Sequence, residues 1–168
     1  NGMASGVMVR GLRPEDISKK PLLEKGIKRT LTSMEFFGDD KVAIGVNLAE
    51  RMGLDVGGTI VLIAPKGKTT PFGTIPRSRS FIVGAIFDVG MYEYNNAYIF
   101  MPMDMAQAFF DMGSSVSALE VVATSTSAVV GIKPAIETEF SDEYGISDWQ
   151  NNNASFYNAL QVERNVMF

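Results

Sequence analysis

The side chains that could do chemistry in this chain are its carboxylates and two closely spaced arginines, because it contains no histidine and no cysteine. Without these residue types the sequence cannot form a Ser-His-Asp triad, a catalytic thiol, an imidazole base or a zinc site of the usual kind. Adjacent carboxylates occur at 39–40 and 142–143, but neighbouring side chains point in different directions and make poor acid-base pairs. We therefore predict that the chain is not an enzyme and holds no metal and no cofactor.

The arginines belong to the segment TPFGTIPRSRS, residues 70–80, which sets Phe72 between a proline and a glycine. Its GTIPRSRS part lacks the spacing of a phosphate-binding loop and has prolines where amide donors are needed. Prolines reduce the entropy that a loop loses on docking, and an exposed aromatic ring can fill an apolar groove in a partner. Arg77 and Arg79 could then contact carboxylates or carbonyls at the rim. The alternative is that Phe72 packs on its own domain and the arginines are solvated.

Composition limits the classes of function. The hydrophobic fraction of 46% over 168 residues is that of a folded globular protein, and the net charge of -4 argues against a nucleic-acid partner. No apolar run is long enough to cross a bilayer, and the first residues lack the pattern of a signal peptide. We expect a soluble piece, monomeric in isolation.

The first half of the chain predicts strands around one helix. Residues 6–12 alternate apolar and polar side chains, as a strand does. Ile44, Leu48 and Met52 recur every four residues, which indicates a helix, and Gly53 follows as its C-cap. Further strands are expected at 59–64, 80–87 and 97–102, with a functional loop from 66 to 80 between the first two.

The second half predicts a helix and then a repeating βα pattern. Met105, Phe109 and Met112 share one helical face that we assign to the core, with Gly113 as the stop. Strands are expected at 118–124 and 144–150, and helices at 125–140 and 151–168. The fold class is therefore α+β with two subdomains. One is a βα layer formed by residues 1–12 and 116–168, and the other is a β-rich, small barrel-like insertion of residues 13–115 that bears the loop.

The last predicted helix ends in NVMF with no capping residue, as expected of a fragment cut where a membrane helix begins. Its sequence, DWQNNNASFYNALQVERNVMF, resembles the entry to the second transmembrane helix of the LolC/LolE family, the membrane subunits of the lipoprotein-releasing ABC transporter. Three earlier blocks resemble the same family in the same order. They are IGVNLAERMGLDVGGTIVLIAP, TPFGTIPRSR and FIVGAIFDVGMYEYNNAYIFMPMDMAQ.

This resemblance implies the periplasmic domain of an inner-membrane protein, with the βα layer next to the membrane, as in MacB-type periplasmic domains. It implies a LolA-like periplasmic lipoprotein carrier, a partner membrane subunit, a cytoplasmic ATPase subunit and a lipoprotein substrate as partners. The family's hook, which enters the carrier, falls on Pro71, Phe72, Gly73, Ile75 and Pro76. Its pad falls on Arg77, Ser78 and Arg79. Phe72 stands where the family often has methionine, and Ser78 where glutamine is common.

Three other readings remain open from the sequence. A MacB-type exporter or an FtsX-type cell-wall regulator would share the extracytoplasmic architecture and differ in its partner. The glycine turn and strand in LDVGGTIVLIAP also occur in small β-barrels that bind ligands.

Overall fold

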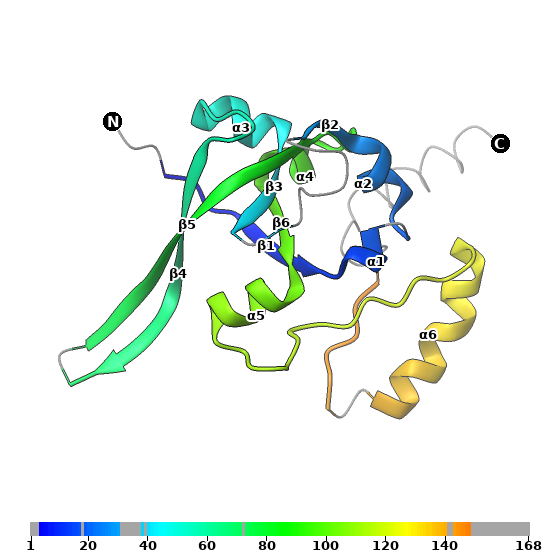
Figure 1. Cartoon of the computed structure of the whole chain (residues 1–168). Helices are drawn as coiled ribbons and strands as arrows, with labels where there is room; N and C mark the ends of the chain where they lie inside the picture. The colour runs from blue at the N-terminus through cyan, green and yellow to red at the C-terminus, as the bar shows by residue number, and fades with distance from the viewer. Residues whose placement is uncertain are drawn as a thin grey trace, which may run out of the picture. The chain divides into compact units, whose positions relative to one another are not determined.

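The computed structural model describes residues 4–17, 19–30, 38, 40–71, 73–140 and 143–148. The fold is α+β, as predicted, with a six-stranded sheet and six helices among the described residues (Figure 1). The strands are β1 (Met8–Leu12), β2 (Ile27–Thr30), β3 (Lys41–Gly45), β4 (Thr59–Thr70), β5 (Gly73–Phe87) and β6 (Tyr98–Pro102). The helices are α1 (Pro14–Ile17), α2 (Pro21–Gly26), α3 (Val46–Met52), α4 (Tyr92–Ala97), α5 (Met103–Phe110) and α6 (Thr126–Phe140).

The sheet is mixed, with the strand order β1-β6-β3-β5-β2, and β4 pairs with β5 outside this path. The pairs β1 with β6 and β3 with β5 are parallel, whereas β5 runs antiparallel to both β2 and β4. β5 is long enough to belong both to the body of the sheet and to a separate pair with β4. Its second half lies between β3 and β2 in the body of the sheet, and its first half pairs with β4.

Both faces of the sheet are buried, because strand side chains alternate between two core clusters. In β3, Val42 and Ile44 belong to the larger cluster and Ala43 to the smaller one. Helices α3 and α5 contribute buried side chains to the larger cluster, and α2 contributes Leu23 to the smaller. Most of the large fully buried side chains come from β3, β5 and β6. These three strands are therefore the rigid centre from which the rest of the sheet extends.

The predicted helix around Ile44, Leu48 and Met52 is only half correct. The chain from Lys41 to Gly45 is strand β3, and the helix α3 begins at Val46. Ile44 of β3 and the helix residues Leu48 and Met52 are spaced four apart by coincidence. Ile44 faces the core as part of the strand, and Leu48 and Met52 face it from the helix. The prediction for the end of α3 is confirmed, since Gly53 is left-handed at φ 63° and its amide caps the helix.

The helix with a core face is confirmed, because Met105 and Phe109 of α5 are buried. It ends earlier than predicted, however. Asp111 takes the left-handed C-cap position before Met112 and Gly113, so Met112 lies beyond the helix.

The chain forms two compact units, residues 1–117 and 118–168. In the second unit α6 is confirmed, but the described residues at 118–124 and 144–148 form no strand. The predicted strand at 118–124 is wrong for this structure, where Leu119 and Val122 are exposed. The helix predicted at 151–168 lies outside the described residues.

β1 pairs with β6 along its whole length and belongs to the first unit. The proposed subdomain of residues 1–12 with 116–168, the barrel-like form of 13–115 and the likeness to MacB-type domains stay predictions. Within the described part of the chain, none of the helices combines the length and apolar character needed to cross a membrane.

Candidate docking site

Strands β4 and β5 form a two-stranded ribbon that runs away from the other strands of the sheet (Figure 1). β4 ends at Thr70 and β5 begins at Gly73, and these two residues are paired. Only residues 71–72 connect the strands. The long loop predicted from 66 to 80 is therefore wrong: the segment is a β-ribbon with a two-residue connection, although it does protrude as a hairpin.

The ribbon accommodates its prolines through an irregularity in the pairing. Ala64 pairs with Arg77 and Lys68 with Ile75, so three residues of β4 lie opposite the single residue Pro76. A bulge of this kind removes the need for an amide donor at the proline. Gly67 makes the bulge possible, since a Cβ there would collide with the carbonyl oxygen of Ile75. This half of β5 has no strand on its other side among the described residues, which also suits a proline.

The tip of the ribbon carries most of the predicted hook. Pro71, Gly73 and Pro76 are exposed, and Ile75 keeps 61% of its surface accessible. Gly73 has φ 121°, a conformation that side chains with a Cβ rarely adopt. Phe72 lies outside the described residues. The described hook residues thus form an exposed, partly apolar end.

Nearer the body, the ribbon has one buried and one exposed face. Ile60 and Leu62 of β4 are buried together with Phe81 of β5, whereas Val61 and Ile63 point to solvent. On β5 the pad residues divide in the same way. Arg77 and Arg79 lie on the face of Phe81, and Ser78 lies on the opposite face and is exposed. The structure therefore brings the two arginines together and separates Ser78 from them.

Each arginine is ion-paired to a carboxylate of the domain body. Arg77 pairs with Asp111, which follows α5, and Arg79 pairs with Asp40, which precedes β3. Arg77 also donates to the carbonyl oxygen of Phe109 at 3.5 Å, a favourable place for a cation because it is the C-terminal end of a helix. The Arg77 side chain is 22% exposed and that of Arg79 is 45% exposed, so Arg79 is the more accessible of the two.

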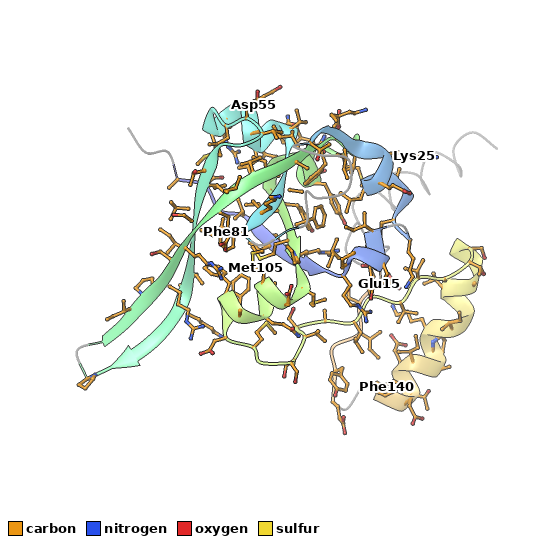
Figure 2. The ribbon with its side chains drawn as sticks, in the orientation of Figure 1. Glu15, Lys25, Asp55, Phe81, Met105 and Phe140 are labelled. Atoms are coloured by element: carbon orange, nitrogen blue, oxygen red, sulfur yellow. The ribbon has the colours of Figure 1, made fainter. Side chains whose placement is uncertain are left out.

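Below the two arginines, aromatic packing joins the ribbon to the core. The ring of Phe81 packs edge-on against Phe109 of α5, with 5.6 Å between the ring centroids. Figure 2 shows Phe81 where the ribbon joins the body, on the side of α5 that carries Met105. The base of the ribbon is therefore fixed by buried packing as well as by ion pairs.

The sequence did not reveal the partners of the arginines. In the sequence, Asp40 stands out only as half of a carboxylate pair, and Asp111 belongs to no functional motif. Both have positive φ, 61° and 59°, and they are the only such non-glycine residues in the part of the chain that is described. The FFDMG stretch offered one signal, since an aspartate next to a helix-stopping glycine can take the left-handed position itself.

A hollow at the base of the ribbon is lined by Asp40, Arg79, Asp104, Met105 and Ala108. Its volume is about 210 Å³ and it is open to solvent, which is less than the roughly 300–1,000 Å³ of a typical ligand pocket. Among the described residues no cluster of carboxylates could hold a metal ion. The exposed ribbon is the better candidate site.

The chain is similar over nearly its whole length to three named proteins. It is 28% identical over 170 residues to the lipoprotein-releasing system transmembrane protein LolC of Neisseria meningitidis serogroup B, covering 99% of this chain. It is 27% identical to the LolC protein of Xylella fastidiosa strain Temecula1, covering 95%, and 26% identical to that of Haemophilus influenzae, covering 91%. The chain is thus similar to LolC proteins. No family model matches it.

The relation to LolC covers only part of those proteins. The chain spans about two fifths of their length, with 40% of the Neisseria protein and 38% of the Xylella protein aligned. The alignments include the β4–β5 ribbon, because they extend over almost all of this chain. The names of these LolC proteins describe a transmembrane component of a lipoprotein-releasing system.

Proposed function

We propose that this chain is the periplasmic domain of an inner-membrane subunit of a lipoprotein-releasing transporter, and that its β4–β5 ribbon recruits a soluble lipoprotein carrier. The observation that carries the proposal is the ribbon itself, a protruding hairpin with an exposed tip, in a chain related to LolC over nearly its full length. The domain acts by binding and not by catalysis. ATP hydrolysis, the partner membrane subunit and the lipoprotein substrate belong to the rest of the assembly.

The chemistry of the tip fits a carrier of acylated proteins. Such a carrier must enclose acyl chains and therefore needs an apolar groove, into which an apolar hairpin end can insert. Ile75 is largely exposed in the free domain, and the sequence places Phe72 in the connection. Burial of one such side chain in a partner contributes about 1.5–3 kcal/mol, which is enough for a few tip residues to dominate the interface.

The form of the ribbon reduces what binding costs in entropy. The tip is held by two paired strands and flanked by Pro71 and Pro76, whose φ angles are fixed. Little backbone freedom is then lost on docking. A flexible loop of the same sequence would bind more weakly.

The pad residues have unequal roles in this proposal. Arg79 is half exposed, and its guanidinium has five N–H donors, so it can contact a rim carboxylate or carbonyl while it remains paired with Asp40. Arg77 is mostly covered and serves the ribbon itself. Ser78 faces the other side of the ribbon and can reach the carrier only if the carrier wraps around it.

The test is a binding titration of the purified domain with its LolA-like carrier. The variants Phe72→Ala and Ile75→Ala should each weaken capture at least about tenfold, as expected for hot-spot side chains, with the melting temperature unchanged. Tyr92→Ala is the matched control, since Tyr92 of α4 is also a large exposed side chain, 65% accessible, but lies off the ribbon. Tip variants that bind the carrier as tightly as the parent domain would exclude the docking role.

A further inference from the structure

Two left-handed aspartates hold the two arginines of the ribbon. Asp40 and Asp111 are the non-glycine residues with positive φ in the described chain, and each forms an ion pair with one arginine of β5. The paired residues are 39 and 34 positions apart in the sequence. Both left-handed aspartates thus bind an arginine of the ribbon, and both arginines of the ribbon are bound in this way.

Glycine would suit these two backbone positions better. The left-handed conformation is unfavourable for a residue with a Cβ, although aspartate tolerates it better than most. Asp111 carries a second disadvantage, because it places a negative charge at the C-terminal end of α5, where the helix dipole favours cations. Glycine is the usual residue at this capping position. The carboxylate at each position must therefore offset a local cost.

We propose that Asp40 and Asp111 form a carboxylate clamp that fixes the direction of the β4–β5 ribbon relative to the sheet. The two aspartates are positioning residues: they hold Arg77 and Arg79, and through them the strand that leads to the tip. The part of the inference that concerns the free domain does not depend on any partner.

The geometry of the clamp suits this task. Arg77 and Arg79 are two residues apart on one face of β5, about 7 Å along the strand, and their aspartates come from different elements, the turn before β3 and the end of α5. Attachment at two points restrains both swinging and twisting of the strand. The backbone of Asp40 adds a third contact, since its carbonyl oxygen accepts from the amide of Ile82 at 2.7 Å.

Core packing holds this part of the ribbon on its β4 side, where Leu62 and Ala64 are buried beside Arg79 and Arg77; the arginines are what hold β5. Beyond Phe81, toward the tip, β5 pairs with β4 only, and a two-stranded ribbon without other support bends and twists readily. The arginines lie just beyond Phe81, at the first positions where β5 has no described strand on its other side. The clamp is therefore placed where it has most influence on the tip.

The clamp also bears on docking, and this second part rests on the proposed function. A tip that is already aligned loses less freedom when it enters a carrier. The clamp residues themselves need not touch the carrier. Removing their charges should weaken capture even though every tip residue is intact.

The experiment measures the direction of the ribbon in the free domain by spin-label distances. The chain has no cysteine, so Lys66→Cys on the ribbon and Glu50→Cys on α3, both exposed, give a unique label pair. We expect one narrow distance distribution in the parent. The double variants Asp40→Asn/Asp111→Asn and Asp40→Gly/Asp111→Gly should both lose it and give a broad one. The glycine pair preserves the left-handed backbone, so broadening there is due to the lost carboxylates.

Asp104→Asn is the matched control. Asp104 lines the same hollow as Asp40 and Arg79 but is not paired with either arginine. Its substitution removes one nearby negative charge, against two in each double variant, and should leave the distribution narrow. A distribution as narrow in both double variants as in the parent would overturn the clamp. Equal broadening in Asp104→Asn would also overturn it, because the effect would then be one of net charge.

Carrier binding is measured separately and distinguishes the two proposals. If the tip variants lose capture and the clamp variants lose both the narrow distribution and part of the capture, the clamp and the docking role both stand. If the distribution broadens but neither tip nor clamp variants change capture, the clamp stands and the docking role fails. An unchanged distribution contradicts the clamp whatever the carrier does.

Discussion

The guanidinium group of Arg79 lies over the ring of Phe81, 5.5 Å from its centroid. The two residues share one face of β5, and they mark the boundary between the exposed ribbon and the buried part of the strand. A cation over an aromatic face is attracted by the ring quadrupole, by about 0.5–1 kcal/mol at an exposed site. One contact thus couples an ion pair at the surface to the packing of the core.

Phe81→Ala should destabilise the first unit by about 3–5 kcal/mol, the usual range for a buried phenylalanine. Phe81 is fully buried and packs against Phe109, so the substitution leaves a cavity and removes the contact beneath Arg79. Urea unfolding checks the value. Val61→Ala is the control on the opposite, exposed face of the ribbon and should change the free energy of unfolding by less than about 0.5 kcal/mol.

Gly67→Ala should disrupt the ribbon at its bulge. A Cβ at Gly67 would collide with the backbone of Ile75, and a backbone neighbour cannot move aside as a flexible side chain can. We expect faster amide exchange in the distal ribbon and weaker carrier capture. Gly131→Ala in α6 has open space around the new Cβ and should stabilise its helix by about 0.5–1 kcal/mol. Similar exchange in Gly67→Ala and the parent would contradict the proposed bulge geometry.

Asp88 should make the first unit sensitive to acid. Hydrogen bonds to its carboxylate from the amide of Gly90 and the side chain of Asn95 lower its pKa from the ordinary value of 3.8. A carboxyl whose pKa is lower in the folded state stabilises the fold above its unfolded pKa, and this contribution is lost as the pH falls through the folded pKa. The melting temperature of Asp88→Asn should therefore lie below that of the parent at neutral pH and approach it below the folded pKa. If the melting temperatures of Asp88→Asn and the parent differ by the same amount at every pH, the charge of Asp88 does not contribute to the acid sensitivity.

Carrier association should slow as salt is added. The ribbon from residue 59 to residue 80 contains Lys66, Lys68, Arg77 and Arg79 and no acidic residue, although the whole chain has a net charge of -4. The two arginines are offset by Asp111 and Asp40, so among the described side chains of the ribbon the exposed Lys66 is the main source of positive potential. Such a charge accelerates encounter with an acidic carrier surface, and salt screens it over about 10 Å at 0.1 M. Stopped-flow rates at increasing salt test this. Lys66→Gln should reduce the salt dependence, and a rate independent of salt would exclude electrostatic steering by the ribbon.

Elements with one dominant local signal could be predicted from the sequence. Strand β1, the buried half of β5, β6 and the helices α5 and α6 each have a clear periodicity or an evident start or stop residue. The distal ribbon could not, because its three prolines and two glycines are typical of a loop. What makes it a strand is the bulge opposite Pro76, and pairing over that distance is not a local property of the sequence.

The candidate site divides in a similar way. The hook and pad positions could be read from a contiguous segment, and the described ones do lie on the protruding hairpin. The carboxylates that hold the arginines could not be read there. Asp40 and Asp111 come close to Arg79 and Arg77 only through the register of β5 with β3 and the packing of α5. The expected strand at 118–124 failed for a related reason: its apolar residues fit a sheet, but no described strand pairs with them.

β5 is one uninterrupted strand from the tip to the sheet interior, so the exposed hairpin is continuous with a strand in the core. A pull on the tip along the strand would load the parallel rungs between β3 and β5 together, in shear, instead of opening them one at a time. Under the proposed docking role, a force that a bound carrier exerts on the tip would reach the centre of the sheet directly through β5.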